Sequence, residues 1–438
     1  MSDRSLVLVL SNDFSLASAK TSRHLCVALN RLGYGAVGRD TRLVRWAAGE
    51  VLKESPARQE AFEIASVSKW MKFINDYGIE RVVSLDLNWL FTSQLFIDDE
   101  RIKGIHSFWF DDLRSYLLAS PMFPMDRTTL DVINSPNVKH HCYGRGQQEE
   151  LRLLGVNQIF PSPLAAPREY VERDEPCTEM NRLAFIGNPG LSNPPTRVAL
   201  EVMNRGGTID ELRAIARQEI LSGLRINEPS ATWLRESPEI TDLMAAATEL
   251  RLTRPHDAAI SLLTEAGQAW PEAFDYLNRA GAILDATTLV KFVNRYDRPS
   301  LVHRLWQRGW LDVFGTPEQW APYGIKAQPT VPFPQLPAIY SRYAAHLNAA
   351  NCARDATANE KLFEIAACGR ASLNLDSPDV RACYTEDEVC LADSDLALEA
   401  LAEQIVQDPS AALAMGSRAR ERTAAEHLWE HRLRKAFA

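Results

Sequence analysis

Short apolar runs alternate with amphipathic stretches along the first part of the chain. Residues 5–10, SLVLVL, are a continuous apolar run flanked by polar residues, which is typical of a buried parallel strand. In the stretch 23–35, Leu25, Leu29 and Leu32 recur at helical spacing and form one apolar stripe. The pattern therefore predicts a strand, a loop and a helix in that order.

The same alternation continues to about residue 155. Helical spacing is found at 66–78 and 146–155, and strand-like runs occur at 81–87, 102–112 and 130–137. Strands that alternate with helices are typical of a doubly wound sheet with parallel strands.

The alternation of strand-like and helical stretches ends at 159–177. This stretch contains four prolines, and we interpret it as a linker. A new apolar run, NRLAFIGNPG at 181–190, leads into a glycine-rich turn and repeats the start of the first domain. We therefore predict an N-terminal Rossmann-like domain at 1–170, a second Rossmann-like domain at 178–425 and a closing helix at 426–438.

Strand patterns are nearly absent between about 194 and 305, where the apolar residues follow helical spacing. We predict an α-helical insertion in the second domain. Strand patterns return at 310–315, 345–350, 371–375 and 388–392. The expected fold class is α/β, with two Rossmann-like domains that face a cleft, and ligands of such sheets bind beyond the carboxyl ends of the strands.

Composition narrows the possible functions. The 438 residues carry a net charge of −9, which argues against broad binding to nucleic acid or to an anionic membrane, although a local basic cleft stays possible. Seven cysteines without CxxC spacing favour a reduced cytoplasmic protein. The adjacent His140 and His141 lack the partners of a zinc site, and no apolar run has the length of a signal peptide core or a membrane span.

Four pieces of the second domain follow predicted strands and should lie at the carboxyl edge of its sheet. They are the turn Gly187–Gly190, the pair Phe314 and Gly315, the residue Asn348, and the stretch NEKLFEIAACG at 359–369. A glycine-rich turn lets backbone amides approach an anion, and a glycine at a strand end lets a flat base lie against the backbone. Each of the first three pieces can equally be an ordinary turn.

The fourth piece combines several chemical groups at the start of one helix. Thr357 and Glu360 fit a capping box, so we predict that Thr357 is the N-cap. The free amides of the first turn and the charge of Lys361 would attract a diphosphate. Glu364, one turn further on, could accept hydrogen bonds from the vicinal hydroxyls of a ribose. The alternative is a solvated helix face with a capping glutamate.

Residues 361–369, KLFEIAACG, resemble the R-x-F-E-x-x-A-C-G motif of CgeB-like glycosyltransferases of the spore-maturation type, a GT-B group. AFIGNPG, VFG and IYSRYAAHLN are similar to the family's stretches before the motif. The closing segment, with His427, Trp429 and Arg432, is similar to its tail. The resemblance implies a GT-B fold and a glycosyltransferase whose nucleotide-diphosphate-sugar donor is bound mainly by the second domain.

The resemblance also implies roles for single residues. Glu364 would hold the donor ribose, and Lys361 would meet the diphosphate in the place of an arginine, with the same charge but without the bidentate fork. No metal or cofactor is expected, because helix ends and basic side chains stabilise the leaving diphosphate. The role of Glu360 stays open between a cap and a catalytic neighbour. The expected donor-binding residues are Gly187, Asn188, Phe314, Gly315, Asn348, Asn359, Glu360, Lys361 and Glu364.

The catalytic base and the stereochemical course are not fixed by the sequence. Ala356 lies eight residues before Glu364, so the pair of glutamates found in many retaining GT-B enzymes is absent. If the enzyme inverts, a base of the first domain must deprotonate the acceptor hydroxyl. Asp111 and Asp112 are the best candidates, followed by Asp13, while His24 and His106 are further possibilities.

Three functions are compatible with these patterns. The first is glycosyl transfer from a nucleotide-sugar to a hydroxyl of a glycan, lipid, protein or modified base, with a nucleic acid acceptor disfavoured by the charge. The second is a sugar-nucleotide epimerase of the same fold. The third is an inactive glycan- or protein-binding module.

Overall fold

The chain forms two compact units in a computed structural model. The structure describes residues 5–11, 16–40, 76–86, 97, 100–109, 127–173, 175–190, 194–223, 238–279, 282–352, 355 and 357–438. The first unit takes its described residues from 1–143, 151–162 and 428–438, and the second from 144–150 and 163–427.

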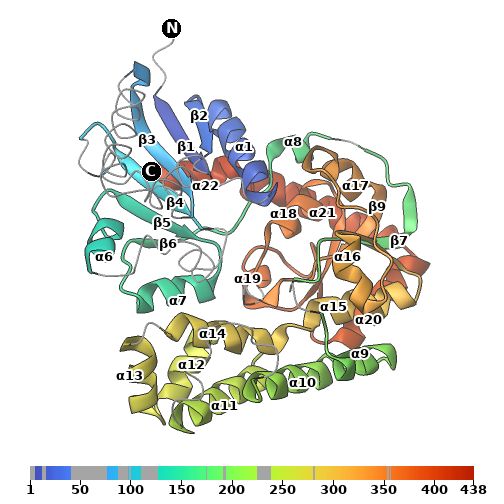
Figure 1. Ribbon diagram of the computed structural model, residues 1–438. Coiled ribbons are helices and arrows are strands. Elements are labelled where there is room, and N and C mark those ends of the chain that lie inside the picture. Colours follow the sequence, from blue (N-terminus) through green and yellow to red (C-terminus); the bar gives the residue numbers. More distant parts are fainter. Residues whose placement is uncertain are drawn as a thin grey trace, which may run out of the picture. The chain divides into compact units, whose positions relative to one another are not determined.

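The first unit contains a six-stranded sheet with the order β2-β1-β3-β4-β5-β6, and every neighbouring pair is parallel (Figure 1). The apolar residues of its inner strands are buried, as the continuous apolar runs predict, and β4 also buries His106 and Ser107. The strands are β1 (Leu6–Ser11), β2 (Gly35–Asp40), β3 (Ile79–Leu85), β4 (Gly104–Phe108), β5 (Val138–Cys142) and β6 (Ile159–Pro161).

The last helix of the chain belongs to this first unit. Helix α22 (Trp429–Phe437) contacts α1 (Leu16–Arg31), and the ring of Phe437 lies 5.3 Å from Tyr34 and 4.8 Å from His106. The other described helices here are α6 (Arg127–Ile133) and the end of α7 (Arg145–Leu153), whose first six residues belong to the second unit.

Two sequence predictions in this unit are wrong. Residues 130–137 were expected to form a strand, but the helix α6 ends at Ile133 and the strand β5 begins only at Val138. The spacing of Leu130 and Ile133 fits one face of a helix as well as a short apolar run. Strand β5 was not recognised, because its two adjacent histidines are not apolar residues. Strand β2 was missed because its glycines have low strand propensity. A Cβ on Gly35 would lie 2.3 Å from the end of the Leu6 side chain, so a larger residue here would displace that side chain.

The second unit contains a five-stranded parallel sheet with the order β11-β10-β9-β7-β8. The chain runs from β7 outward to β8 and then returns to the other side of β7 to form β9. The carboxyl ends of β7 and β9 therefore flank the topological switch point. The strands are β7 (Glu179–Ile186), β8 (Leu311–Phe314), β9 (Tyr343–Leu347), β10 (Ala371–Leu375) and β11 (Cys390–Ala392).

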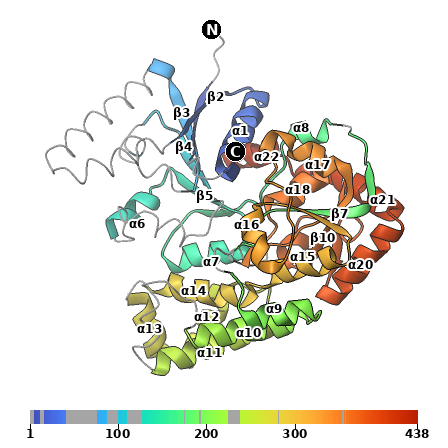
Figure 2. The same cartoon turned by 45° about the vertical axis from the view of Figure 1, so that its right-hand side comes forward.

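Between β7 and β8 the described residues form helices, which gather at the bottom of Figure 1 and are seen from another side in Figure 2. Buried ion pairs join them, including Arg213 with Asp297 at 2.7 Å and Arg295 with Glu219. They are α9 (Arg197–Asn204), α10 (Ile209–Leu221), α11 (Pro238–Thr253), α12 (Ala259–Gly267), α13 (Pro271–Arg279), α14 (Ile283–Lys291), η3 (Phe292–Asn294) and α15 (Asp297–Gln307).

The remaining helices of the second unit surround its sheet. They are α8 (Arg168–Val171), α16 (Pro317–Trp320), η4 (Ala321–Tyr323), η5 (Phe333–Gln335), α17 (Leu336–Arg342), α18 (Glu360–Ala367), α19 (Pro378–Arg381), α20 (Asp395–Gln407) and α21 (Ser410–Glu426).

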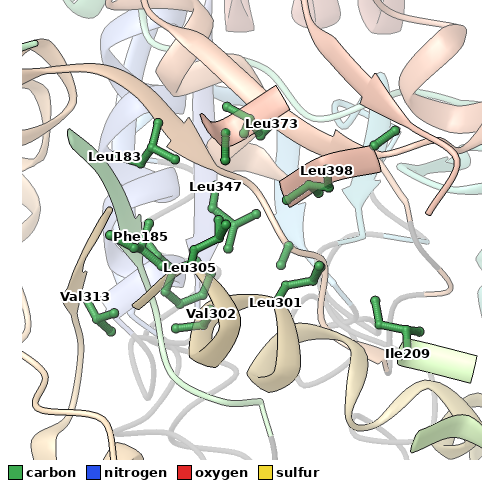
Figure 3. Close-up of a cluster of buried hydrophobic side chains, with 14 of the residues drawn as sticks. Leu183, Phe185, Ile209, Leu301, Val302, Leu305, Val313, Leu347, Leu373 and Leu398 are labelled. Atoms are coloured by element: carbon green, nitrogen blue, oxygen red, sulfur yellow. The ribbon is translucent and has the colours of Figure 1, made fainter. Parts of the chain in front are cut away.

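The main hydrophobic core of the second unit lies on one face of this sheet. Leu183 and Phe185 of β7 pack there with Leu305 of α15 and Leu398 of α20 (Figure 3). Ala184, between the two, belongs to a separate cluster, because successive residues of a strand point to opposite faces. Both faces of β7 are therefore buried between Leu183 and Phe185.

The predicted fold class is confirmed by the two parallel α/β sheets. The strands expected near 5–10, 81–87, 181–190, 310–315, 345–350, 371–375 and 388–392 are all present. The proline-rich stretch at 159–177 starts with the edge strand β6, and the boundary between the units at 162–163 falls within it.

Buried histidines make the stability of the first unit dependent on pH. Burial lowers the pKa of His24 and of His141 to about 3, and that of His140 to about 4. His140 is held as a neutral tautomer, because its Nε2 donates to the Ile133 carbonyl at 3.1 Å while its Nδ1 accepts from the Trp109 indole at 3.3 Å.

These depressed pKa values predict a loss of stability in mild acid. Below about pH 6.5 the unfolded chain binds protons that the folded histidines do not bind, so the free energy of unfolding falls as the pH is lowered from 7 to 5. We expect each of the three histidines to contribute about 1–2 kcal/mol to this fall. Urea unfolding at pH 7 and at pH 5 measures the fall in the free energy of unfolding. In the His140→Gln variant this fall should be smaller by the contribution of one histidine. A stability that is equal at pH 7 and pH 5 would contradict the prediction.

Candidate functional site

The turn after β7 lies closely against the end of β8. A Cβ on Gly315 would lie 2.4 Å from the Gly187 carbonyl oxygen and 2.8 Å from the Trp320 indole nitrogen, so only glycine fits at this position. Gly187 has a φ of 150°, which also favours glycine, and its amide donates to the Phe314 carbonyl at 2.8 Å. The structure thus brings together the predicted pieces around 187 and 315.

Side-chain hydrogen bonds fix this turn. The Oδ1 atom of Asn188 accepts from the Thr316 amide at 2.8 Å, and the Trp320 indole donates to the Gly187 carbonyl at 2.9 Å. The side chain of Asn188 therefore joins the β7 turn to the β8 exit.

Arg298, at the start of α15, is a site residue that the sequence analysis missed. Its guanidinium donates to the Asn188 carbonyl at 3.0 Å, to the Ala349 carbonyl at 3.0 Å and to the Ala350 carbonyl at 3.3 Å. One side chain thus joins the turn after β7 to the segment after β9, on both sides of the switch point. No sequence motif marks this role, because the three acceptors are backbone atoms far from Arg298 in the chain.

The start of α18 differs from the prediction. The N-cap is Asn359 and not Thr357, because the Oδ1 atom of Asn359 accepts from the Lys361 amide at 3.0 Å and from the Leu362 amide at 3.3 Å. The capping-box interpretation of Thr357 and Glu360 was wrong, since the Thr357 hydroxyl is buried without a partner among the described residues. Two of the amides expected to be free for an anion are thus already satisfied by Asn359.

Lys361 places a positive charge at the β7 turn. A Cβ on Gly187 would lie 3.1 Å from the Lys361 ammonium nitrogen, so the ammonium is in near contact with the backbone of this turn. The positive end of the α18 dipole lies at the same helix terminus. The predicted combination of a glycine-rich turn, a helix N-terminus and a lysine is therefore present in one place.

Glu364 is buried behind Lys361, with 1% of its surface exposed. Its carboxylate accepts a hydrogen bond from the Tyr340 hydroxyl at 3.0 Å. Burial and the neighbouring Glu364 charge raise the pKa of Tyr340, which keeps this hydroxyl a donor. The predicted contact of Glu364 with a ribose stays a prediction.

The other two predicted pieces follow their strands but are partly or wholly buried. Phe314 is 5% exposed and packs edge-on against Tyr343. Asn348 follows β9, and its amide nitrogen donates to the Oδ1 atom of Asn374 at 2.8 Å. Their proposed contacts with a donor stay predictions.

Some of the candidates for the catalytic base lie outside the described residues, and the others are buried. Asp13, Asp111 and Asp112 lie outside the described residues. His106 lies in β4 as expected, where it is 3% exposed and contacts the His141 ring nitrogen at 3.2 Å, and burial lowers its pKa well below the usual value. His24 is also buried, on α1, so neither histidine is presented as a solvent-accessible base.

Two further features of the described residues bear on the kind of site. No group of three or more His, Cys, Asp or Glu residues among them is arranged to hold a metal ion. Of the helices in the described part of the chain, none has both the length and the apolar character needed to cross a bilayer.

Residues 298–438 match the glycosyl transferase-like family. The match begins at Arg298 and includes β8, β9, α18 and α22, so it contains most of the elements that form the site. The similarity to this family therefore covers about the last third of the chain and does not include the helices that precede residue 298.

Comparison with solved structures gives distant likenesses that extend over nearly whole chains. Sucrose-phosphate synthase from Thermosynechococcus elongatus is 12% identical, with a TM-score of 0.47 over 99% of this chain and 98% of that one. Spinosyn rhamnosyltransferase with thymidine diphosphate is 9% identical, with a TM-score of 0.35 over 99% of this chain and 100% of that one. No curated protein sequence matches the chain significantly.

The Arg298 contacts predict a sensitive position. Arg298→Lys should lower the free energy of unfolding by about 1–3 kcal/mol, because a lysine ammonium cannot reach three carbonyls that are spread around a planar guanidinium. The control is Arg308→Lys, at the opposite end of the same helix, whose side chain is 60% exposed and pairs with Glu399. Urea unfolding compares the two variants. Equal stability of Arg298→Lys and Arg308→Lys would show that the three hydrogen bonds of Arg298 do not stabilise the fold.

Proposed function

We propose that the protein transfers a sugar from a nucleoside-diphosphate-sugar to a hydroxyl acceptor without a metal ion. The observation that carries the proposal is the position of the Lys361 ammonium beside the Gly187 turn, at the switch point of the second sheet. Parallel α/β sheets bind ligands at such points, and the surrounding segment matches a glycosyltransferase family.

The chemistry of the leaving group explains why a cation belongs there. When the glycosidic bond breaks, the nucleoside diphosphate leaves with an additional negative charge. The Lys361 ammonium and the N-terminal end of the α18 dipole can stabilise that charge from fixed positions. Gly187 and Asn188 would border the phosphates, while the nucleobase would lie near Phe314 and Gly315.

Glu364 would accept hydrogen bonds from the ribose hydroxyls, with Tyr340 fixing one of its oxygen atoms. The base that deprotonates the acceptor is proposed among Asp111, Asp112 and Asp13. The CgeB-like subtype is proposed from the residues Lys361 to Gly369. A reducing, cytoplasmic setting is proposed because all seven cysteines are free and five of them are buried.

A panel of nucleotide-sugars tests the proposed reaction. The protein is incubated with the glucose, galactose and N-acetylglucosamine conjugates of UDP, the mannose conjugate of GDP and the glucose and rhamnose conjugates of dTDP. Release of a nucleoside diphosphate by transfer, or by slow hydrolysis in the absence of an acceptor, is the expected result. Interconversion of two nucleotide-sugars without release would show an epimerase instead, and the absence of any binding or turnover would contradict a donor site.

The role of Lys361 can be separated from that of the rest of the site. Lys361→Met should weaken the binding of the matching nucleoside diphosphate about 10- to 100-fold and leave the affinity for the free nucleoside unchanged, because only the phosphates meet the charge. Isothermal titration calorimetry measures both affinities.

Lys326→Met, at an exposed lysine of the same unit, is the matched control and should change neither affinity. Equal losses for nucleoside and nucleoside diphosphate in Lys361→Met would contradict a phosphate role.

A further inference from the structure

The segment between β9 and α18 leads to the helix start that carries Lys361. Its first residues are held by Arg298, whose guanidinium donates to the Ala349 and Ala350 carbonyls. Further on, Asp355 is 7% exposed and has a φ of 46°, in the left-handed region that few residues other than glycine adopt. Aspartate tolerates this region better than most residues, but the conformation persists only where the surroundings fix it.

Two groups of the preceding helices hold the Asp355 carboxylate. The Arg251 guanidinium of α11 donates to its Oδ1 atom at 2.9 Å, and the Ala259 amide at the start of α12 donates to its Oδ2 atom at 3.2 Å. Arg251 also donates to the Asp257 carbonyl, and its side chain is fully buried. A buried ion pair with both carboxylate oxygens engaged allows little displacement, so it fixes Asp355 relative to α11 and α12.

The start of α7 covers the same segment from another side. A Cβ on Gly146 would lie 2.7 Å from the Oδ2 atom of Asp355, so a larger residue there would displace a carboxylate that two other groups already hold. A Cβ on Gly144 would lie 2.3 Å from a methyl carbon of Thr357. Residues 144–150 belong to the second unit, as do α11 and α12. Asp355 is therefore enclosed between the start of α7 and these two helices.

Only a short, packed stretch separates Asp355 from α18. Asn359, four residues later, is the N-cap of the helix, and Lys361 follows two residues after it. Thr357, Ala358 and Asn359 are between 1% and 7% exposed, so close packing prevents them from absorbing a displacement of Asp355. A change in the position of Asp355 is therefore transmitted to the first turn of α18.

We propose that Asp355 is a positioning residue, through which the helices α11 and α12 set the place of the Lys361 ammonium beside the Gly187 turn. Both helices lie in the part of the chain that precedes the match to the glycosyl transferase-like family. The helical segment thus has a role in the site without contact with the ligand. Its effect on the reaction rests on the proposed function, because it acts through the charge that the diphosphate would meet.

The test removes the ion pair without leaving a buried charge unpaired. In the double variant Arg251→Met/Asp355→Asn, asparagine tolerates the left-handed φ, and its Oδ1 atom can still accept from the Ala259 amide. The bond to α11 is therefore the one that is lost. The matched control is Arg295→Met/Glu219→Gln, which removes another buried ion pair of the helical segment.

Hydrogen exchange, followed by mass spectrometry on the full chain, measures how firmly the start of α18 is placed. Backbone amides in peptides that cover 357–363 should exchange about five- to tenfold faster in Arg251→Met/Asp355→Asn than in the wild type. Peptides of α20 should keep the wild-type rate, and the control variant should keep it in both regions. This readout needs no ligand.

Calorimetry with UDP, GDP, ADP and dTDP, and with the corresponding nucleosides, measures the effect on the site. We expect Arg251→Met/Asp355→Asn to bind the matching nucleoside diphosphate about five- to tenfold more weakly and the free nucleoside with unchanged affinity, since only the phosphates meet Lys361. A general loosening of the fold would weaken both ligands. The control variant should change neither affinity.

Gly146→Ala perturbs the same carboxylate from the α7 side while Arg251 and Asp355 stay in place. Alanine is a better helix former than glycine, so α7 itself should be retained. We expect the same faster exchange at 357–363 and the same split between the two ligands. If Arg251→Met/Asp355→Asn does not fold, this single variant provides the test.

The outcomes separate this inference from the proposed function. Unchanged exchange at 357–363 in both variants would overturn the inference, whatever the calorimetry gives. Faster exchange with an unchanged affinity for the nucleoside diphosphate, or equal losses for nucleoside diphosphate and nucleoside, would overturn it as well. If the wild-type chain binds no nucleoside diphosphate while the variants exchange faster at 357–363, the placement of α18 by Asp355 stands and the proposed donor function is wrong.

Discussion

The arrangement of the site depends on one guanidinium. Arg298 holds the segments that leave β7 and β9 at a fixed separation, although its three acceptors are backbone carbonyls of two distant segments. These bonds join the two segments directly, beyond the ends of the strands that carry them. Because the acceptors are carbonyls, they impose no requirement on the side chains at 188, 349 and 350. The contact therefore fixes the spacing of the two segments without requiring particular side chains in them.

The turn that Arg298 holds also lies beside a fixed positive charge. The Lys361 ammonium is in near contact with Gly187, and the N-terminal end of the α18 dipole lies at the same helix terminus. A rigid backbone turn and a cation are therefore combined in one place, which is the combination that the proposed diphosphate requires.

Much of the fold could be predicted from the sequence, because buried parallel strands are continuous apolar runs and amphipathic helices have a distinct period. The wrong predictions concern elements in which the apolar pattern is weak. Strand β2 contains two glycines, which have low strand propensity, and β5 contains two histidines whose burial is decided by tertiary contacts. The N-cap of α18 was misassigned because Thr357 and Asn359 are both good capping residues, and only the path of the chain selects between them.

For the site, local motifs identified the glycine turn and Lys361, which are close together in the structure. Arg298 could not be identified in this way, because its three acceptors lie 51, 52 and 110 residues away in the chain. Its role depends on long-range packing, which no local motif of the sequence indicates.

The path of the chain between the two units has a consequence for biosynthesis. The first unit contains the first strand, but it also contains α22, the last helix of the chain, whose Phe437 packs against Tyr34 and His106. Because the second unit lies between these partners in the chain, a ribosome synthesises them far apart in time. The first unit therefore begins to fold early but is completed only after the second unit has been synthesised, so the nascent chain carries an uncovered surface on α1 and β4 for most of its elongation.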